Sequence, residues 1–566
     1  MFANVIVFTP TNPKIPYFTY KIPKNLEKKV VLGQLVLVPW GKKNTQGVIF
    51  SFSQKTDLKN PKELGQILLT SPVVKPTQIE LLSWLSWYYH APLQDCLKTM
   101  LLSLSNTKRL TTIAKYHIPL KSLSRSALNI KQTIILVPTI NQIPEILATL
   151  PKRSQVALYH HQLKPGELFN NWLKIYSGEV DFVVGSRSAI FAPVPNLKKI
   201  TIYAEHDSTY KDERSPYYHA KKVAEKLTDV TGCKLEIIDL VPSVATFFEA
   251  GKAKSSFKLK LAKPKNIAQV EIVDMEQERR LQNFSPISED LASEIKKTPK
   301  KGRILLYLNR KTEAGTAFCL SCKTSGYFQT PPETCPNCKN PQIQFFSLNL
   351  SKVANEVKKL TPTVEPEIIA ANTKPKLTAK ILLATSAIFY LPIPFRFDLV
   401  GLISADGILN LPDFAAAEKT FAVISQLAEL TNPAGKLVIQ TINPDHYAVK
   451  LAVEGNFKKF YQTELAERKA LKFPPFSILA KLTIEGKNKD VTGWQAEDLS
   501  EKLRQVNPSI EILGPVPTIP LSRRVGGKTL TGYNIILKAA KREDLEPVLN
   551  LVPAGWKIDV EPDNLL

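Results

Sequence analysis

The sequence has no long apolar run and few cysteines. No stretch reaches 18 consecutive apolar residues, and Met1-Phe-Ala-Asn4 lacks the basic start and apolar core of a signal peptide. We therefore expect a cytoplasmic protein without membrane contact. Only six of 566 residues are cysteine, and four of these form one cluster. This pattern argues against a disulfide framework and favours metal binding in a reducing compartment.

A phosphate-binding loop is also missing. Such a loop has the form G-x-x-x-x-G-K-[ST], because its backbone amides cradle phosphates and its lysine and hydroxyl serve the β/γ oxygens and Mg²⁺. The closest string is Gly526-Gly-Lys-Thr529, with Ser522 where the first glycine should stand. We interpret it as a basic turn and do not expect ATP or Mg²⁺ to bind there.

Charge gives the first positive indication. The chain is long enough for three to five domains, and its 75 Lys and Arg against 51 Asp and Glu give a formal net charge of +24. A balance this basic favours a polyanionic partner, with DNA or RNA the leading candidates. The alternative is a generally basic proteome, since the excess is spread along the chain.

Two buried strands with charged ends lie near residue 200. Asp181–Val184 and Ile200–Tyr203 are apolar on both faces, as parallel strands covered by helices are. Because ligands bind beyond the carboxyl ends of such strands, Gly185–Arg187 and Glu205–Asp207 are candidate functional loops. Two ordinary strands with polar loops remain an equal alternative.

The cysteine cluster predicts a metal centre. Cys319, Cys322, Cys335 and Cys338 follow the pattern C-x₂-C-x₁₂-C-x₂-C. Two such pairs can fold back on one tetrahedral zinc ion, and four thiolates leave no open coordination position. We expect one structural zinc; four free thiols are the less favoured alternative.

The N-terminal segment reads as short strands separated by Gly and Pro, followed by a helix predicted over Thr77–Tyr89 with Thr as its N-cap. Its motifs Phe18-Thr-Tyr20, Gly33–Gly41 and Trp84–Leu93 resemble those of primosomal protein N-prime, the replication restart helicase family PriA. The resemblance continues in Gly185–Pro193 and Glu205–Lys211 and runs to the C-terminus.

The resemblance implies an N-terminal pocket for the 3′ end of a nascent strand. Phe18 and Gly41 match its positions. Thr19 stands where the family has an acidic residue, and Gly65 where it has a lysine, so the grip on the terminal hydroxyl is left open. The family's winged helix and phosphate loop have no counterpart in the polar, basic stretch 106–130.

The family's catalytic motifs are replaced here. Its D-E-E-H sequence is matched by Tyr203, Ala204, Glu205 and His206, which together with Arg187 would form a degenerate nucleotide site. Ala384 and Ser386 replace residues of a Gly-Thr-Gln loop, and Gln426–Asn432 stands where arginine fingers should be. An arginine finger is typically worth about 10³ to 10⁵ in rate, so negligible hydrolysis is expected.

The zinc region is reduced relative to the family, whereas the C-terminal region matches the family's closing domain. The family has eight cysteines and two zinc ions, whereas this chain keeps the outer two pairs only. The resemblance also implies that the C-terminal domain contacts single-stranded DNA and the single-strand-binding protein. Arg523, Arg524 and Lys528 lie on a Gly-rich turn that could contact phosphates, and a solvated face is nearly as good an interpretation.

The expected architecture is multidomain α/β. It comprises a β-rich DNA-binding domain, two RecA-like parallel α/β lobes with a zinc-binding insertion, and an α+β C-terminal domain. The predicted boundaries are 1–105 for the N-terminal domain, 106–130 for a basic linker, 131–255 for lobe 1, 256–300 for a connector, 301–316 with 346–445 for lobe 2, 317–345 for the insertion and 446–566 for the C-terminal domain.

The resemblance implies a protein of replication restart that binds branched or forked DNA, here without ATPase or helicase activity. Its implied partners are single-stranded DNA, the single-strand-binding protein, and the replicative helicase or its loader. One alternative is an active ATP-dependent 3′–5′ helicase with divergent motifs. The other is a zinc-dependent interaction module that no longer binds DNA.

Overall fold

The structure is a computed structural model, and it describes most of the chain. The described residues are 1–9, 15–101, 131–252, 256–261, 269–309, 315–328, 332–346, 348–370, 375–525 and 528–565. The predicted basic linker lies outside them. Among the helices of these segments, none combines the length and apolar character needed to cross a bilayer.

The N-terminal domain is an antiparallel sheet followed by two helices. The strand order is β2-β1-β4-β3-β5. The elements are β1 (Phe2–Val7), β2 (Phe18–Lys21), β3 (Leu35–Trp40), β4 (Lys43–Ser53), β5 (Gln66–Ile67), α1 (Pro76–Tyr88) and α2 (Leu93–Met100). The predicted Thr77 cap is wrong: α1 begins at Pro76 with Lys75 as its N-cap. Proline suits the first helical position because the N–H it lacks would have no partner within the helix.

The first lobe is a fully parallel sheet. Its order, β11-β10-β9-β6-β8-β7, places the two strands predicted near residue 200 on either side of β6. The strands are β6 (Gln132–Leu136), β7 (Val156–Tyr159), β8 (Phe182–Gly185), β9 (Leu197–Tyr203), β10 (Lys234–Asp239) and β11 (Phe257–Leu261). The helices are η2 (Ile140–Gln142), α4 (Ile143–Thr149), α5 (Pro165–Tyr176), η3 (Arg187–Phe191), η4 (Ser208–Tyr210), α6 (Ala220–Thr231) and α7 (Val244–Ala250).

The second lobe repeats this architecture. Its parallel sheet has the order β12-β20-β19-β13-β18-β17. The strands are β12 (Gln269–Asp274), β13 (Ile304–Tyr307), β17 (Glu367–Ile369), β18 (Ile381–Ala384), β19 (Phe397–Leu402) and β20 (Thr431–Thr441). The helices are α8 (Met275–Arg280), α9 (Glu289–Lys297), α10 (Leu350–Leu360), η5 (Ser386–Tyr390), α11 (Asp406–Leu409) and α12 (Ala416–Leu430). The stretch 256–300, expected to be a connector, thus supplies β11 to one sheet and β12 to the other.

Two smaller antiparallel sheets complete the fold. The zinc-type insertion has the order β15-β14-β16, with β14 (Gly315–Cys319), β15 (Ser325–Phe328) and β16 (Ile343–Phe346). After α13 (Tyr447–Val453) and α14 (Phe457–Ala470), the C-terminal domain has the order β22-β23-β21-β24. Its elements are β21 (Ile478–Gly486), α15 (Lys489–Arg504), β22 (Glu511–Val525), β23 (Lys528–Ala539), α16 (Arg542–Leu549) and β24 (Lys557–Val560). The predicted fold class is confirmed, while the exact domain boundaries stay predictions.

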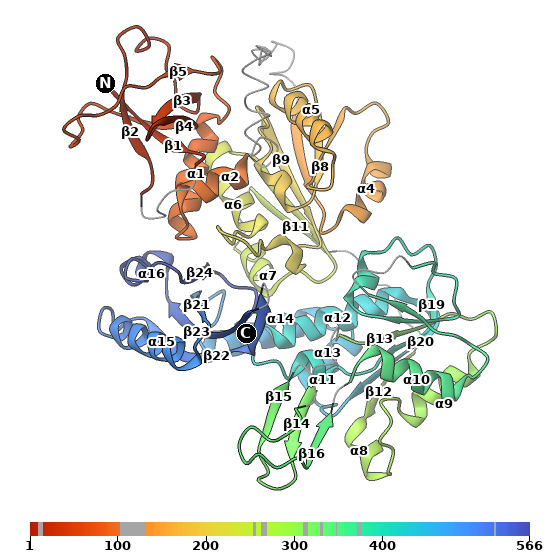
Figure 1. Ribbon diagram of the computed structural model, residues 1–566. Coiled ribbons are helices and arrows are strands. Elements are labelled where there is room, and N and C mark those ends of the chain that lie inside the picture. The colour runs from red at the N-terminus through yellow and green to blue at the C-terminus, as the bar shows by residue number, and fades with distance from the viewer. Residues whose placement is uncertain are drawn as a thin grey trace.

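The C-terminal domain closes back on the first half of the chain. In Figure 1 its sheet lies beside lobe 1, and α1 and α2 join the N-terminal sheet to the same lobe. One continuous apolar core includes Leu82 of α1, Trp172 of lobe 1 and Leu545 of α16. Arg542 adds a buried polar link, because its Nε donates to the Tyr88 carbonyl at 2.6 Å. These contacts set the position of the cleft described next.

Candidate nucleic-acid interface and metal centre

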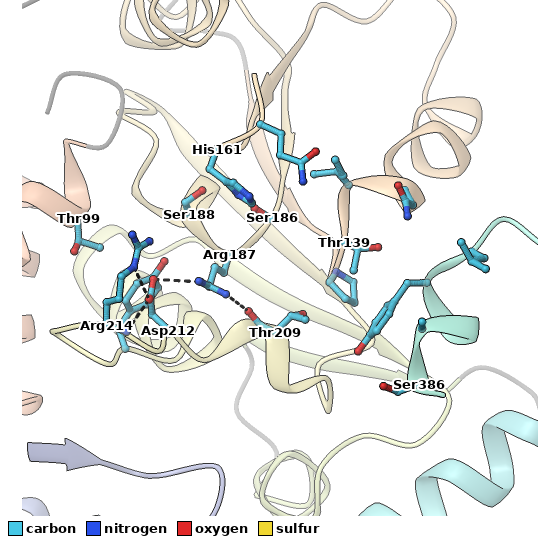
Figure 2. A pocket seen from close by; sticks show the side chains of 18 of the residues that line it. Thr99, Thr139, His161, Ser186, Arg187, Ser188, Thr209, Asp212, Arg214 and Ser386 are labelled. Carbon is cyan, nitrogen blue, oxygen red and sulfur yellow. Dashed lines mark hydrogen bonds and ion pairs between the residues drawn. The ribbon is translucent and has the colours of Figure 1, made fainter. Parts of the chain in front are cut away.

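A cavity of about 700 Å³ lies at the carboxyl ends of the lobe 1 strands. Its walls come from the segments after β6, β7 and β8, from η4 and the loop that follows it, from α2, and from η5 of lobe 2. Figure 2 shows polar side chains from several of these elements around one space, among them Thr139, Ser186, Arg187 and Ser386. Gly185 permits the tight turn that begins one wall, since a Cβ there would lie 2.0 Å from the Tyr159 carbonyl oxygen.

Three hydroxyls in the wall of the cavity lack protein partners. Within the described residues, the buried hydroxyls of Thr139, Ser188 and Thr209 form no hydrogen bond, although each residue lines the cavity. Buried hydroxyls are normally paired, and because these oxygens have almost no accessible surface, a polar ligand in the cavity would pair with them after a χ1 rotation. The exposed guanidinium of Arg214 adds positive charge at the same wall.

Arg187 has a structural position within this wall. Its Nε donates to Asp212 Oδ2 at 3.2 Å, and its Nη1 donates to the Thr209 carbonyl at 2.9 Å. Figure 2 shows both contacts as dashed lines. Arg187 therefore lines the cavity and holds η4 in place, whereas Tyr203 to His206 are not among the lining residues.

Glu205 and His206 lie at the end of β9, in contact with lobe 1 and lobe 2 groups. Glu205 accepts hydrogen bonds from the Ser243 amide and hydroxyl at 3.2 and 3.1 Å, and its burial raises the pKa of its carboxyl. His206 Nδ1 lies 2.9 Å from Asp239 Oδ1, and its Nε2 lies 2.8 Å from the Gln426 amide. Burial alone would lower the pKa of His206, but the Asp239 carboxylate outweighs it and raises that pKa to about 9.

Tyr203 and Ala204 supply no carboxylate. Tyr203 ends β9, and burial raises the pKa of its phenol, which favours the neutral form. Ala204 adopts a φ of 47°, unusual for a residue with a Cβ, and its N–H donates to the Ile238 carbonyl at 2.9 Å.

The N-terminal residues predicted to bind the 3′ end of a DNA strand lie close together. The Phe18 and Trp40 rings meet edge to face with centroids 4.6 Å apart, and Gly41 follows Trp40 with a φ of 59°. Lys62 Nζ donates to the Gly41 carbonyl at 3.2 Å. Lys62 is not among the predicted residues, because Gly65 was matched to the position of the family's lysine. At Gly65 a Cβ would lie 2.9 Å from the Leu37 carbonyl oxygen.

The Thr19 side chain forms a hydrogen bond within the sheet. Its hydroxyl donates to Asn4 Oδ1 at 2.8 Å across the β1–β2 pair. The groups left at this candidate pocket are therefore an aromatic edge, the backbone at Gly41 and the ammonium group of Lys62.

The four cysteine Sγ atoms converge. All lie within 4.8 Å of one another, and the Cys319–Cys338 and Cys322–Cys335 pairs are 3.5 and 3.6 Å apart. A tetrahedron with Zn–S bonds of about 2.3 Å has S–S edges of about 3.8 Å. The donor set thus fits a single closed zinc site, with Cys319 and Cys335 buried and Cys338 exposed.

Two matching turns build this centre. The Lys323 amide donates to the Cys319 carbonyl, and the Lys339 amide donates to the Cys335 carbonyl. Lys323 and Lys339 each follow the second cysteine of a pair and each have a φ of 60°. Hydrogen bonds from Thr324, chiefly from its side chain and then from its backbone, lower the pKa of Cys322 to about 5.

The basic residues of the C-terminal domain lie on a hairpin. Arg523 pairs with Leu530 and Arg524 with Thr529, so the backbone there is strand β22 and the predicted turn at these two residues is wrong. Lys528 begins β23.

Two family models match the ends of the chain. Residues 4–102 match a 3′ DNA-binding domain of PriA, and residues 469–563 match the primosomal protein N C-terminal domain. The chain is 31% identical to the replication restart protein PriA of Bacillus subtilis over 504 residues, covering 81% of this chain and 62% of that protein. For the Synechocystis protein of that name the identity is 26%, covering 77% of this chain and 59% of the relative.

Other comparisons extend over different shares of the chain. The replication restart protein PriA of Rickettsia felis is 24% identical and matches over 96% of this chain and 97% of its own length. A solved structure of RecG bound to a three-way DNA junction aligns with 65% of this chain and 45% of that chain, at 11% identity and a TM-score of 0.31. A TM-score this low carries no argument here.

Fold and sequence together define a class of architecture: two parallel α/β lobes with a four-cysteine insertion, flanked by an antiparallel N-terminal domain and an α+β C-terminal domain. The resemblance inferred from its motifs, to the PriA replication restart proteins, is confirmed by the matches at both ends and along the chain. The chain spans about three fifths of the length of the first two relatives.

Proposed function

We propose that this chain binds branched or forked DNA in replication restart, as a scaffold without ATP hydrolysis or unwinding. The observation that carries the DNA-binding part is the cavity at the strand ends, where the hydroxyls of Thr139, Ser188 and Thr209 lack partners. Hydroxyls and arginines of this kind contact phosphate oxygens and position a nucleic-acid backbone without reading its sequence. The net charge of +24 supports the same ligand class.

Three features support the absence of ATP hydrolysis. Tyr203 and Ala204 leave the end of β9 without the acidic pair that binds Mg²⁺ and orients water. Glu205 and His206 are engaged with Ser243 and Asp239. The described sheet of lobe 1 also pairs continuously from β7 at one edge to β11 at the other. A further strand bearing a phosphate loop therefore has no place between its strands.

Fork binding is the first test. We expect the fluorescence anisotropy of labelled forked DNA to report binding that weakens steeply with salt, since phosphate contacts release counterions. Lys98→Ala with Arg214→Ala changes two basic residues at the cavity and should reduce the log–log salt slope by roughly 2. The matched control, Arg279→Ala with Lys296→Ala, removes the same charge from the second lobe. Equal losses in both double variants would contradict a role for the cavity.

Measuring ATP turnover distinguishes the scaffold proposal from its leading alternative, an active helicase with divergent motifs. The intact protein, given Mg·ATP and forked DNA, should release phosphate no faster than buffer. Turnover that stops when Mg²⁺ is chelated would refute the scaffold proposal. Binding that is absent at low salt would favour a zinc-dependent interaction module without DNA.

The 3′-end pocket is a further part of the proposal. Phe18 and Gly41 would face the terminal nucleotide, with Lys62 near its phosphate. The intact protein should prefer forks with a free 3′ hydroxyl, and Phe18→Ala should remove that preference while leaving salt-dependent binding. Equal affinity of the intact protein for blocked and free ends would remove end recognition from the proposal.

The remaining assignments rest on the family resemblance. One structural zinc would be held by Cys319, Cys322, Cys335 and Cys338. Single-strand-binding protein and the replicative helicase or its loader are the proposed protein partners, and Arg523, Arg524 and Lys528 the proposed C-terminal contacts to single-stranded DNA.

A further inference from the structure

Direct hydrogen bonds join the two lobes. The Tyr390 hydroxyl, from η5 of lobe 2, donates to Asp207 Oδ2 of lobe 1 at 2.7 Å. The Val244 amide, at the start of α7 in lobe 1, donates to Glu418 Oε1 of α12 at 2.9 Å. The His206–Gln426 contact described above is a third connection, and it also joins β9 to α12.

An apolar core spans the same boundary. Val241 and Val244 of lobe 1 pack in one buried cluster with Phe421 of α12, Leu451 of α13 and Phe460 of α14. Each of these five side chains is at most 4% exposed. Residues that follow β10 are thus part of the interior formed by helices of the second half of the chain.

Two aromatic rings lock this core together. Phe247 of α7 stacks on Tyr461 of α14, with ring centroids 4.0 Å apart and planes within 7° of parallel. The Tyr461 hydroxyl also donates to the Pro242 carbonyl at 2.7 Å, and Tyr461 is fully buried. Separating the lobes here would expose both rings and leave a buried carbonyl without its partner.

A buried ion triad holds the acceptor for α7. Arg468 of α14, only 4% exposed, donates to Glu418 at 2.5 Å and to Glu464 at 2.7 Å. Arg468 therefore holds the Glu418 carboxylate in place while this carboxylate accepts the hydrogen bond from the Val244 amide. Movement of α7 away from α12 would break the Val244–Glu418 hydrogen bond, while the ion pairs of Arg468 within α12 and α14 would remain.

We propose that these contacts form an interlobe clasp that holds the two lobes as one rigid platform, with the DNA cavity set in advance and unaffected by nucleotide. Lobes separated by a solvent-filled cleft change their spacing when a ligand binds one arrangement better than the other. Here the chain's own aromatic and ionic side chains occupy the boundary, so one arrangement is strongly favoured without any ligand.

The spacing between the lobes tests this proposal. Clickable amino acids at Lys174 of α5 and Lys296 of α9, both exposed, allow donor and acceptor dyes to be attached while all six cysteines stay intact. Single-molecule energy transfer in the full-length protein should show one narrow population, unchanged by Mg·ATP or by forked DNA. A second population, or a shift with either addition, would overturn the clasp.

Variants show whether the named residues are responsible. Phe247→Ala with Tyr461→Ala should broaden the distribution and accelerate amide exchange in α7 by about tenfold or more. Tyr390→Phe with Gln426→Ala, which leaves the apolar core intact, should accelerate it less. Phe284→Ala, which truncates an 80% exposed ring, is the control and should change nothing. Distributions and exchange as narrow and slow as in the parent protein, in both double variants, would contradict the assignment.

The outcomes for the clasp and for the proposed function are separable. ATP turnover without movement would refute the scaffold proposal and leave the clasp standing. Lobe movement without turnover would refute the clasp alone.

Discussion

His206 connects charge, burial and lobe contact in one side chain. Its side chain is 14% exposed, and the carboxylate of Asp239 faces its Nδ1, with Asp207 and Glu205 adding smaller negative contributions. A charged imidazole donates from both nitrogens, so Gln426 then presents its carbonyl oxygen to Nε2. The orientation of that amide follows the proton on His206, which makes the contact between the lobes sensitive to pH.

The pH dependence of stability should reveal this pairing. The pKa of His206 is raised to about 9 in the folded state, so its contribution is fully present below about pH 6.5 and is lost as pH rises through 9. The loss should be on the order of 3 kcal/mol. Denaturant unfolding measured from pH 6 to 9.5 should therefore show stability falling in the parent protein. His206→Gln should flatten this fall; identical curves would contradict the pairing.

At the scale of elements, the zinc insertion shows a short segment that depends on its metal. The β14, β15 and β16 strands form a three-stranded sheet; Cys319 ends β14, and the other three cysteines lie in the segments between the strands. A sheet of three short strands needs a hydrophobic face or further support to be stable alone. A structural zinc contributes on the order of 10 kcal/mol to small domains of this kind.

Cys335→Ser should therefore remove the metal and unfold the insertion. We expect metal analysis to fall from one zinc per chain to near zero, with amide protection lost between Ala317 and Gln344 and kept in the parallel sheets. Cys233→Ala changes a cysteine outside the cluster and should keep the zinc. One zinc per chain retained in Cys335→Ser would contradict a four-cysteine site.

Local patterns explain which features could be predicted. The strands near residue 200 were recognisable because each contains a short run of mostly apolar residues, and the zinc site because spacing alone brings four thiols together. The start of α1 was missed although Pro76 is a local signal for the first helical position, and its N-cap Lys75 matches no capping preference. Lys75 reaches the Pro193 carbonyl 118 residues away, a tertiary contact that no cap motif encodes.

The sequence placed a candidate site at the carboxyl ends of the strands near residue 200, but it could not identify the unpaired hydroxyls of the cavity wall. Thr139, Ser188 and Thr209 come from three different strand ends and match no motif of a hydroxyl site. What distinguishes them is the lack of a hydrogen-bond partner, and that property depends on the packing of the whole lobe. Lys62 could have been predicted, because it lies only three residues before Gly65, the position matched to the family's lysine.

At the scale of the whole molecule, the end of the chain holds the domains together. Lys211 of lobe 1 is 6% exposed; its Nζ donates to the carbonyls of Val560 and Glu561, each at 2.8 Å, and forms an ion pair with Asp559 Oδ1 at 2.8 Å. Lys419 of lobe 2 reaches the Asp563 carbonyl at 2.8 Å. The C-terminal segment 559–563 therefore contacts both lobes, through the buried ammonium group of Lys211 and the partly exposed one of Lys419.

Lys211→Met should release this attachment. Removing the ammonium group leaves two carbonyls and one carboxylate without their shared donor, at a cost of about 3 kcal/mol or more. We expect a lower thermal midpoint and faster amide exchange in β24, with lobe 2 protected as before. Lys226→Met is the matched control, because Lys226 pairs with Glu80 at 3.2 Å and Glu80 is 57% exposed. Exposed pairs contribute below about 1 kcal/mol, so equal destabilisation by the two changes would mean that the C-terminal strand is not anchored through Lys211.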